Sequence, residues 1–143
     1  NVGSAAVANE SLQTFLLDRV GVSPEAVFAA DGSGLSTLDR VTPRSMVALL
    51  GYTAMAPWGA VLQASLPVAG QTETLKSRMR RTAAQGNLRG KTGTTNEVTS
   101  LGGYVTAKNG EELAFAFIYN GRDLWRARDA IDAMGVTLAS FSR

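Results

Sequence analysis

The chain has 143 residues, 45% of them hydrophobic and 18% charged, and a formal net charge of +2. This composition predicts a single globular domain with its own core, and so small a charge argues against nucleic acid as a partner. The absence of histidine and cysteine excludes Ser-His-Asp and thiol catalysis, disulfides and most zinc sites, which leaves acid–base chemistry to Lys, Asp, Glu, Ser or Tyr.

Two helices are predicted in the first part of the chain. Residues 8–20 carry a helical apolar pattern, which places four side chains on one face: Leu12, Phe15, Leu16 and Val20. Residues 29–40 have the composition of a loop. Thr42 followed by Pro43 then predicts a helix start, with a hydroxyl N-cap and a proline at the first helical position. This second helix is expected to end near Ala56.

The segment between the second helix and the predicted sheet has weaker signals. A short helix is expected after Pro57, up to about residue 65. Thr72 or Thr74 is expected to cap a further helix, on which the basic run at residues 76–81 would form a solvated face. The apolar side of this helix would point inward: Leu75 and Met79.

The second half of the chain predicts an antiparallel meander followed by a covering helix. Strands are expected at residues 88–94, 101–107 and 112–119, and Asn109-Gly110 indicates a hairpin turn between the last two. The last helix, from about residue 124, has apolar residues at helical spacing, so the fold class is α+β. The third strand is apolar on both faces, which is typical of a central strand, so the sheet is expected to be incomplete within this chain.

A glycine-rich stretch around a lysine, QGNLRGKTGTTNE, is the first candidate site. It looks like a phosphate-binding loop, but the glycine spacing differs from that motif and strand-forming residues follow where a helix is required. Lys91–Thr94 could be an ordinary exposed turn. It could also be an edge strand on which a glycine admits a ligand beside a fixed positive charge.

The stretch DGSGLS at Asp31–Ser36 is the second candidate site. A hydroxyl-rich tight turn is the common outcome for such a string, and the ligand spacing of a calcium loop is missing. Its position directly before a well-capped helix is nevertheless typical of loops that carry function.

Three stretches together resemble the D-alanyl-D-alanine carboxypeptidases of the low-molecular-mass class C penicillin-binding protein family. They cover nearly the whole chain in order: DGSGLSTLDRVTPRSM, LPVAGQTETLKSRMRRTAAQGNLRGKTGT and LGGYVTAKNGEELAFAFIYNG. The resemblance implies the serine penicillin-recognising fold, in which an antiparallel five-stranded sheet has helices packed on both faces. Residues 1–143 would be the C-terminal part of that domain, with three strands here and two supplied by an upstream segment.

The resemblance also implies serine acyl transfer on peptidoglycan stem peptides that end in D-Ala-D-Ala, as a carboxypeptidase or an endopeptidase. β-Lactams would acylate the same serine. In the Lys-Thr-Gly motif, Lys91 would supply positive potential, with Gly93 beside it. Thr92 and Thr94 would bind the substrate's carboxylate, and the Thr94 amide would form half of an oxyanion hole.

The second motif of the family is a serine followed closely by an asparagine. By resemblance, Ser36 would relay a proton to the leaving amine. The asparagine is missing, and Asp39 is the residue nearest to it in character. A carboxylate accepts but cannot donate as an amide does, so Asp39 would bind the substrate without the hydrogen bond that an asparagine donates.

The nucleophile of the family lies in Ser-x-x-Lys, and no serine of this chain has a lysine three residues on. The chain alone is therefore predicted to be inactive, with the nucleophile supplied by a missing N-terminal segment or a partner chain. Two alternatives stay open: an inactive peptidoglycan-binding or scaffolding module of this fold, and a β-lactamase relative, which fits the three stretches less well.

The resemblance implies an extracytoplasmic protein, either periplasmic or associated with the cell wall, and it implies no metal and no cofactor. No apolar run approaches the length of a membrane span, so no membrane span is predicted. The first residues also lack the charged and apolar pattern of a signal peptide.

Overall fold

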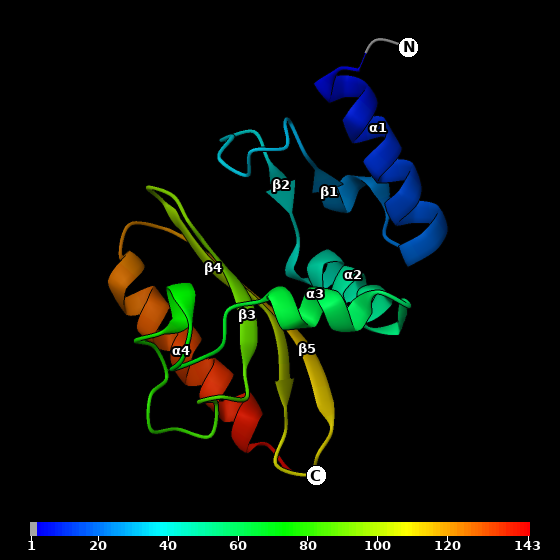
Figure 1. Ribbon diagram of the computed structural model, residues 1–143. Helices are drawn as coiled ribbons and strands as arrows, with labels where there is room; N and C mark the ends of the chain where they lie inside the picture. Colours follow the sequence, from blue (N-terminus) through cyan, green and yellow to red (C-terminus); the bar gives the residue numbers. More distant parts are fainter. Residues whose placement is uncertain (1–2) are drawn as a thin grey trace.

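The computed structural model describes residues 3–143, and Figure 1 shows the order of the elements. A helical region leads into an antiparallel sheet that a long last helix covers. The helices are α1 (Ala5–Phe15), α2 (Pro43–Met55), α3 (Gly59–Ser65) and α4 (Leu124–Ser140). The strands are β1 (Val27–Phe28), β2 (Arg40–Val41), β3 (Arg89–Thr94), β4 (Val98–Thr106) and β5 (Glu112–Asn120).

The N-terminal helix forms where the apolar pattern predicts it and begins three residues earlier. Ser4 caps α1, because its hydroxyl accepts a hydrogen bond from the Val7 amide at 3.3 Å. The helix continues into a π-helical turn at Leu16–Val20, and Gly21 ends it in the left-handed conformation at φ 76°. Strands β1 and β2 then pair with each other and enclose the loop predicted at residues 29–40.

The predicted start of α2 is confirmed in detail. The Thr42 hydroxyl accepts from the Ser45 amide at 3.1 Å, and Pro43 is the first helical residue. The short helix α3 also forms, and Ser65 is its last residue. No single helix within residues 3–143 is long and apolar enough to cross a membrane. The pair α2 and α3 passes that test only when joined across a 119° bend.

The helix predicted from Thr72 or Thr74 is wrong. Only a 3₁₀ turn forms there, at Glu73–Leu75, and the segment continues irregularly up to β3. Met79 and Arg81 have φ angles of 55° and 58°, left-handed values that no right-handed helix accommodates. The basic run at residues 76–81 is consequently not a helix face. The predicted burial of the two apolar side chains is confirmed all the same: Leu75 and Met79.

The three predicted strands and their hairpin turn are confirmed, with β4 starting three residues early. The sheet has the order β3-β4-β5, and both pairs are antiparallel. Gly110 takes the left-handed conformation of the hairpin turn at φ 87°. Although β5 is apolar on both faces, it lies at an edge of the sheet within residues 3–143, as expected for a sheet that this chain does not complete.

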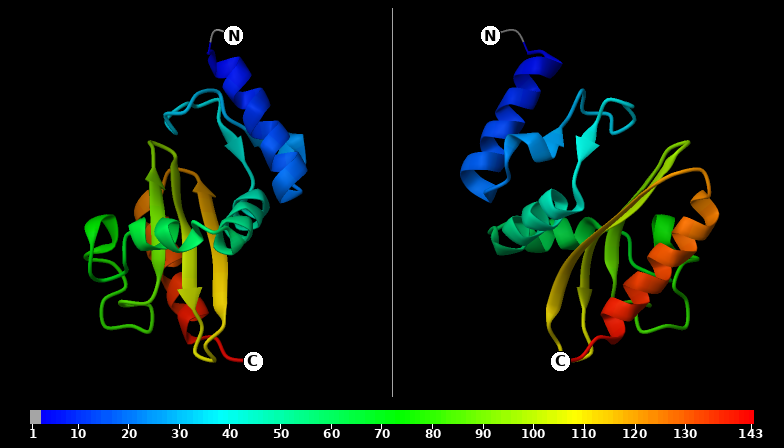
Figure 2. Two further views of the ribbon diagram at one scale, coloured as in Figure 1. Left: turned by 45° about the vertical axis from the view of Figure 1, so that its right-hand side comes forward. Right: turned by 180° about the vertical axis from the view of Figure 1, so that it is seen from behind.

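Figure 2 shows α4 behind the sheet and α3 in front of it, with α2 beside β5. The core lies between β4 and α4, and its largest fully buried side chains are Leu75, Leu88, Leu101 and Val105. Buried residues of α4 face this core: Ala127, Ile131, Gly135 and Ala139. The irregular segment before β3 therefore contributes directly to the hydrophobic core, which explains why packing overrides its helical pattern.

A buried hydrogen-bond network joins α2 to the sheet. The Tyr104 hydroxyl on β4 donates to the Leu50 carbonyl at 2.8 Å and lies 2.6 Å from the Thr53 hydroxyl. Tyr104 and Thr53 are only 3% and 6% exposed. Because the loop that bears the second candidate motif leads into α2, this network fixes that part of the chain to the sheet.

We expect Tyr104→Phe to lower the free energy of unfolding by about 1–2 kcal/mol, because it deprives buried polar groups of a partner. Urea denaturation followed by circular dichroism would measure this change. The control is Tyr52→Phe, since Tyr52 packs edge-on against Phe15 and makes no side-chain hydrogen bond to any residue in the range 3–143. Equal stability of both variants would contradict a structural role for the network.

Candidate functional site

Lys91 stands on β3, at the edge of the sheet, and its side chain is exposed. Its ammonium group donates to the carbonyl oxygen of Thr92 at 2.7 Å. None of the ion pairs formed within residues 3–143 involves this lysine. The positive charge is therefore held at the strand without a carboxylate to neutralise it.

The outer edge of β3 is covered at its start and open beyond it. The Gly90 amide donates outward to the Pro67 carbonyl at 2.9 Å, whereas the Thr95 amide donates inward to Val98 at 2.9 Å. Since backbone groups alternate along a strand, the amides and carbonyls of Thr92 and Thr94 point outward like those of Gly90. No backbone group within residues 3–143 pairs with them there, and the Thr92 carbonyl accepts only from the Lys91 ammonium. An extended peptide could therefore add to this edge as a further strand.

Gly93 has a structural reason that sequence reasoning did not supply. It pairs with Ser100 of β4, and a Cβ atom at Gly93 would lie 2.5 Å from the Ser100 hydroxyl oxygen. The glycine thus accommodates a side chain of the neighbouring strand. Whether it also admits a ligand, as the motif suggests, stays a prediction.

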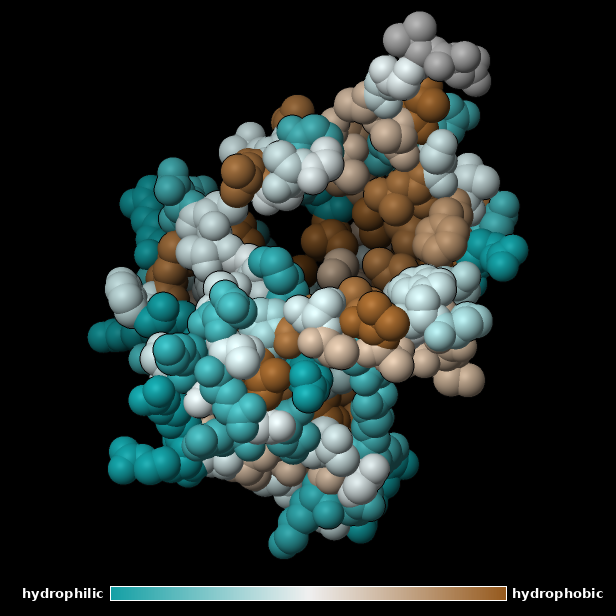
Figure 3. All heavy atoms as spheres, in the orientation of Figure 1, coloured by the Kyte–Doolittle hydropathy of each residue, from teal (hydrophilic) through white to brown (hydrophobic). Residues whose placement is uncertain are grey.

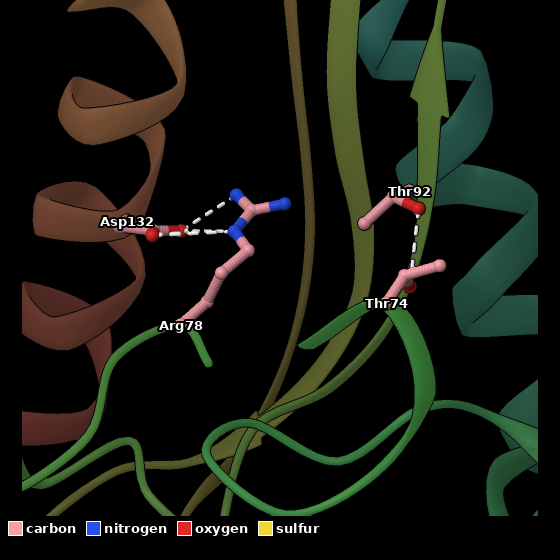
Figure 4. A network of polar contacts seen from close by, with 4 residues as sticks. All are labelled: Thr74, Arg78, Thr92 and Asp132. Carbon is pink, nitrogen blue, oxygen red and sulfur yellow. Dashed lines mark hydrogen bonds and ion pairs between the residues drawn. The ribbon is translucent and has the colours of Figure 1, made fainter. Parts of the chain in front are cut away.

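Thr92 has a hydroxyl partner that sequence reasoning missed. Figure 4 shows Thr74 beside β3, where its hydroxyl oxygen accepts from the Thr92 hydroxyl at 3.2 Å. The same close-up shows Arg78 paired with Asp132 of α4. The sequence singled out Thr74 only as a possible helix cap, and that prediction is wrong.

The loop with the second motif is shaped by its own side chains. The Asp31 carboxylate accepts from the Ser33 hydroxyl at 2.6 Å and from the Ser33 amide at 2.8 Å. These hydrogen bonds lower the pKa of Asp31 below its ordinary value, and the bond from the Ser33 hydroxyl has the larger effect. They favour the turn while Asp31 is ionised, and this contribution is lost as the pH falls through that lowered pKa.

Ser36 is half-buried, and its hydroxyl oxygen accepts from the Leu38 amide at 3.2 Å. Because this hydrogen bond uses only a lone pair, the hydroxyl proton of Ser36 is available to another acceptor. Asp39 closes the base of the loop, since its carboxylate accepts from the Ala30 amide at 2.9 Å. Asp39 therefore has a structural partner, and its expected role toward a substrate stays a prediction.

The two motifs lie toward the same end of the molecule. Figures 1 and 2 place the loop after β1 at the end where the β3–β4 hairpin turns. Figure 3 shows a hollow below this loop with apolar side chains around it. No hydrogen bond or ion pair joins Ser36 to Lys91 among the residues that the structure describes. The two motifs therefore share one end of the molecule without a polar contact between these two side chains.

Apolar side chains are exposed next to this loop. Leu35 and Leu38 are 71% and 63% exposed, and Phe28 of β1 is 45% exposed. An apolar groove of about 330 Å³ also opens where β5, α4 and the start of α2 meet, lined among others by Pro43, Phe117 and Met134. Such surfaces are typical of contact sites for further protein. No cluster of acidic side chains suited to a metal ion occurs in residues 3–143.

The fold and the family follow from comparison with known proteins. The crystal structure of penicillin binding protein 4 (dacB) from Haemophilus influenzae, complexed with a β-lactam, matches with a TM-score of 0.73 and 30% identity. This match covers 82% of the present chain and 27% of the other. It confirms the α+β fold class of the penicillin-binding DD-peptidases.

Residues 2–141 match the profile of the D-Ala-D-Ala carboxypeptidase 3 (S13) family, and the chain belongs to this family. The D-alanyl-D-alanine carboxypeptidase of Actinomadura sp. (strain R39) is 42% identical over 131 residues, which are 88% of this chain and 24% of the relative. Carboxypeptidase DacB of Mycolicibacterium smegmatis is 35% identical over 130 residues, or 87% of this chain and 28% of the relative. The chain thus spans about a quarter of the length of these relatives.

Proposed function

We propose that this chain carries the substrate-binding part of a serine-type D-Ala-D-Ala carboxypeptidase or endopeptidase that acts on peptidoglycan stem peptides. The observation that supports this best is the open outer edge of β3 beside the unneutralised ammonium group of Lys91. An extended peptide with a terminal carboxylate matches both features, because its backbone can pair with the strand while its charge meets the lysine.

Three residues of the strand motif have a role in this proposal. Lys91 supplies positive potential, and the hydroxyls of Thr92 and Thr94 bind the terminal carboxylate. The outward amide of Thr94 donates to the oxyanion that develops during acyl transfer. β-Lactams carry a carboxylate and a reactive amide, so they occupy the same place. Ser36 passes a proton to the leaving amine.

The attacking serine comes from a Ser-x-x-Lys segment outside this chain, on an upstream segment or a partner polypeptide. Three observations support such a contact: β5 lies at a sheet edge, an apolar groove opens beside it, and Leu35 and Leu38 are exposed in the loop that carries Ser36. Strands from that segment would complete the sheet from three to five. The protein would work outside the cytoplasmic membrane, where peptidoglycan lies.

The second candidate is a catalytically inactive peptidoglycan-binding or scaffolding module of the same fold. The observation that favours it is Leu38 in the region where the family motif has an asparagine. The nearby Asp39 carboxylate already accepts from the Ala30 amide. Such a module would bind stem peptides through the same strand edge without hydrolysing them.

Labelling with a fluorescent penicillin separates the two candidates. We expect the isolated chain to remain unlabelled, because it has no serine with a lysine three residues on. We expect covalent labelling when the Ser-x-x-Lys segment is present, either joined to the chain or added to it. Labelling of the isolated chain would contradict the missing-nucleophile argument, and no labelling of the joined protein would favour the inactive module.

A further inference from the structure

We infer that Thr74 is a positioning residue, whose hydroxyl orients the Thr92 hydroxyl toward the carboxylate of the ligand. This inference rests on the proposed function and adds to it a residue outside the Lys-Thr-Gly motif. It starts from the one side-chain hydrogen bond that Thr92 makes within residues 3–143, which runs to Thr74 at 3.2 Å. The two residues are 18 positions apart, so only the tertiary fold brings them together.

The turn that carries Thr74 is anchored by the residues that follow it. Leu75, the next residue, is fully buried in the core, and its carbonyl accepts from the Gly70 amide at 2.9 Å. Farther along, the guanidinium of Arg78 donates to the Asp132 carboxylate at 2.6 and 2.9 Å, in a pair whose side chains are 11% and 21% exposed. Figure 4 shows this pair on α4 and the Thr74–Thr92 contact on β3 at the two ends of the same short segment.

The backbone of this segment is also unusual. Glu73, directly before Thr74, has a φ of 45°, and Met79 and Arg81 have φ angles of 55° and 58°. Non-glycine residues in the left-handed region cost on the order of 1 kcal/mol each and persist only where surrounding contacts hold them. The core contact of Leu75 and the pair of Arg78 with Asp132 are such contacts. These contacts therefore hold the turn that places Thr74 beside β3.

The chemistry of two adjacent hydroxyls explains what Thr74 can do. Without ligand, the Thr92 hydroxyl donates to the Thr74 oxygen at 3.2 Å. When a carboxylate binds at the strand edge, Thr92 donates to it instead, and Thr74 can turn its own proton to the Thr92 oxygen. The two hydrogen bonds then run in one direction and polarise each other, which strengthens the hydrogen bond from Thr92 to the carboxylate of the ligand.

The test uses the protein in which this chain is joined to its Ser-x-x-Lys segment. Acylation efficiency is measured with benzylpenicillin and with its methyl ester, which has the same reactive ring but no carboxylate. We expect Thr74→Val, which preserves the shape but removes the hydroxyl, to slow acylation by the acid about tenfold. Acylation by the ester should change less than about twofold, and Thr74→Ser should restore the rate with the acid.

Two further variants sharpen the result. Ser77→Ala removes a hydroxyl from an exposed residue of the same segment that makes no side-chain hydrogen bond within residues 3–143, and should leave both rates unchanged. In Thr92→Val, the added change Thr74→Val should have no further effect, because Thr74 acts through Thr92. An unchanged rate of Thr74→Val with the acid would overturn the inference, as would equal losses with acid and ester, which would indicate a structural role. If the unaltered joined protein is not acylated at all, the proposed function fails together with this inference.

Discussion

Lys91→Met is expected to reduce acylation by penicillin about a hundredfold or more in the protein that contains both this chain and its Ser-x-x-Lys segment. The Lys91 ammonium is held against the Thr92 carbonyl at the open edge of β3, and no carboxylate of residues 3–143 neutralises it. Removing one preorganised electrostatic donor from an acyl-transfer site typically slows the reaction 10²–10³-fold. Methionine keeps most of the chain length, so the loss would report the charge.

The rate of covalent labelling by a fluorescent penicillin measures this effect. The matched control is Lys108→Met, which removes the same charge from an exposed position next to the β4–β5 turn. We expect Lys108→Met to label like the unaltered protein. If Lys91→Met labels at the same rate as Lys108→Met, the lysine of β3 is not part of the site and the proposed arrangement fails.

Gly103→Ala is expected to lower the free energy of unfolding by about 3–5 kcal/mol, the range of the most disruptive single substitutions. A Cβ atom at Gly103 would lie 2.0 Å from the Arg89 carbonyl oxygen and 2.7 Å from the Gly90 Cα atom. Both are backbone atoms of β3, so no side-chain rotation can relieve the clash. The strand that carries Lys91 would have to separate from β4.

Urea denaturation would measure this loss, and amide hydrogen exchange would show whether β3 loses protection first. Gly102→Ala is the matched control on the adjacent residue. A Cβ atom there would lie 3.5 Å or more from its neighbours, an ordinary van der Waals contact. We expect Gly102→Ala to change the free energy of unfolding by less than about 1 kcal/mol. Similar losses for both variants would show that glycine flexibility, not the close approach of β3, is what matters.

Local signals predicted much of the fold correctly. Thr42-Pro43 marked the start of α2, because N-capping and a proline at the first helical position depend on neighbouring residues alone. Asn109-Gly110 marked the β4–β5 turn for the same reason, since glycine adopts the left-handed conformation of such a turn without a steric penalty. The family resemblance likewise depended on short motifs in order, and the family match confirms it.

Contacts between distant parts of the chain produced what these signals missed. The helix expected after Thr72 is absent because Leu75 packs into the core and Arg78 pairs with Asp132, 54 residues away. Thr74 meets Thr92 only through that irregular segment. The open edge of β3 also depends on a distant contact, because the Pro67 carbonyl pairs with the Gly90 amide and leaves the later residues of the strand without a backbone partner on that side within residues 3–143. Helix caps, turns and motifs could thus be predicted from neighbouring residues. The hydroxyl partner of Thr92 depends on packing between distant segments, and a local sequence pattern carries no information about that packing.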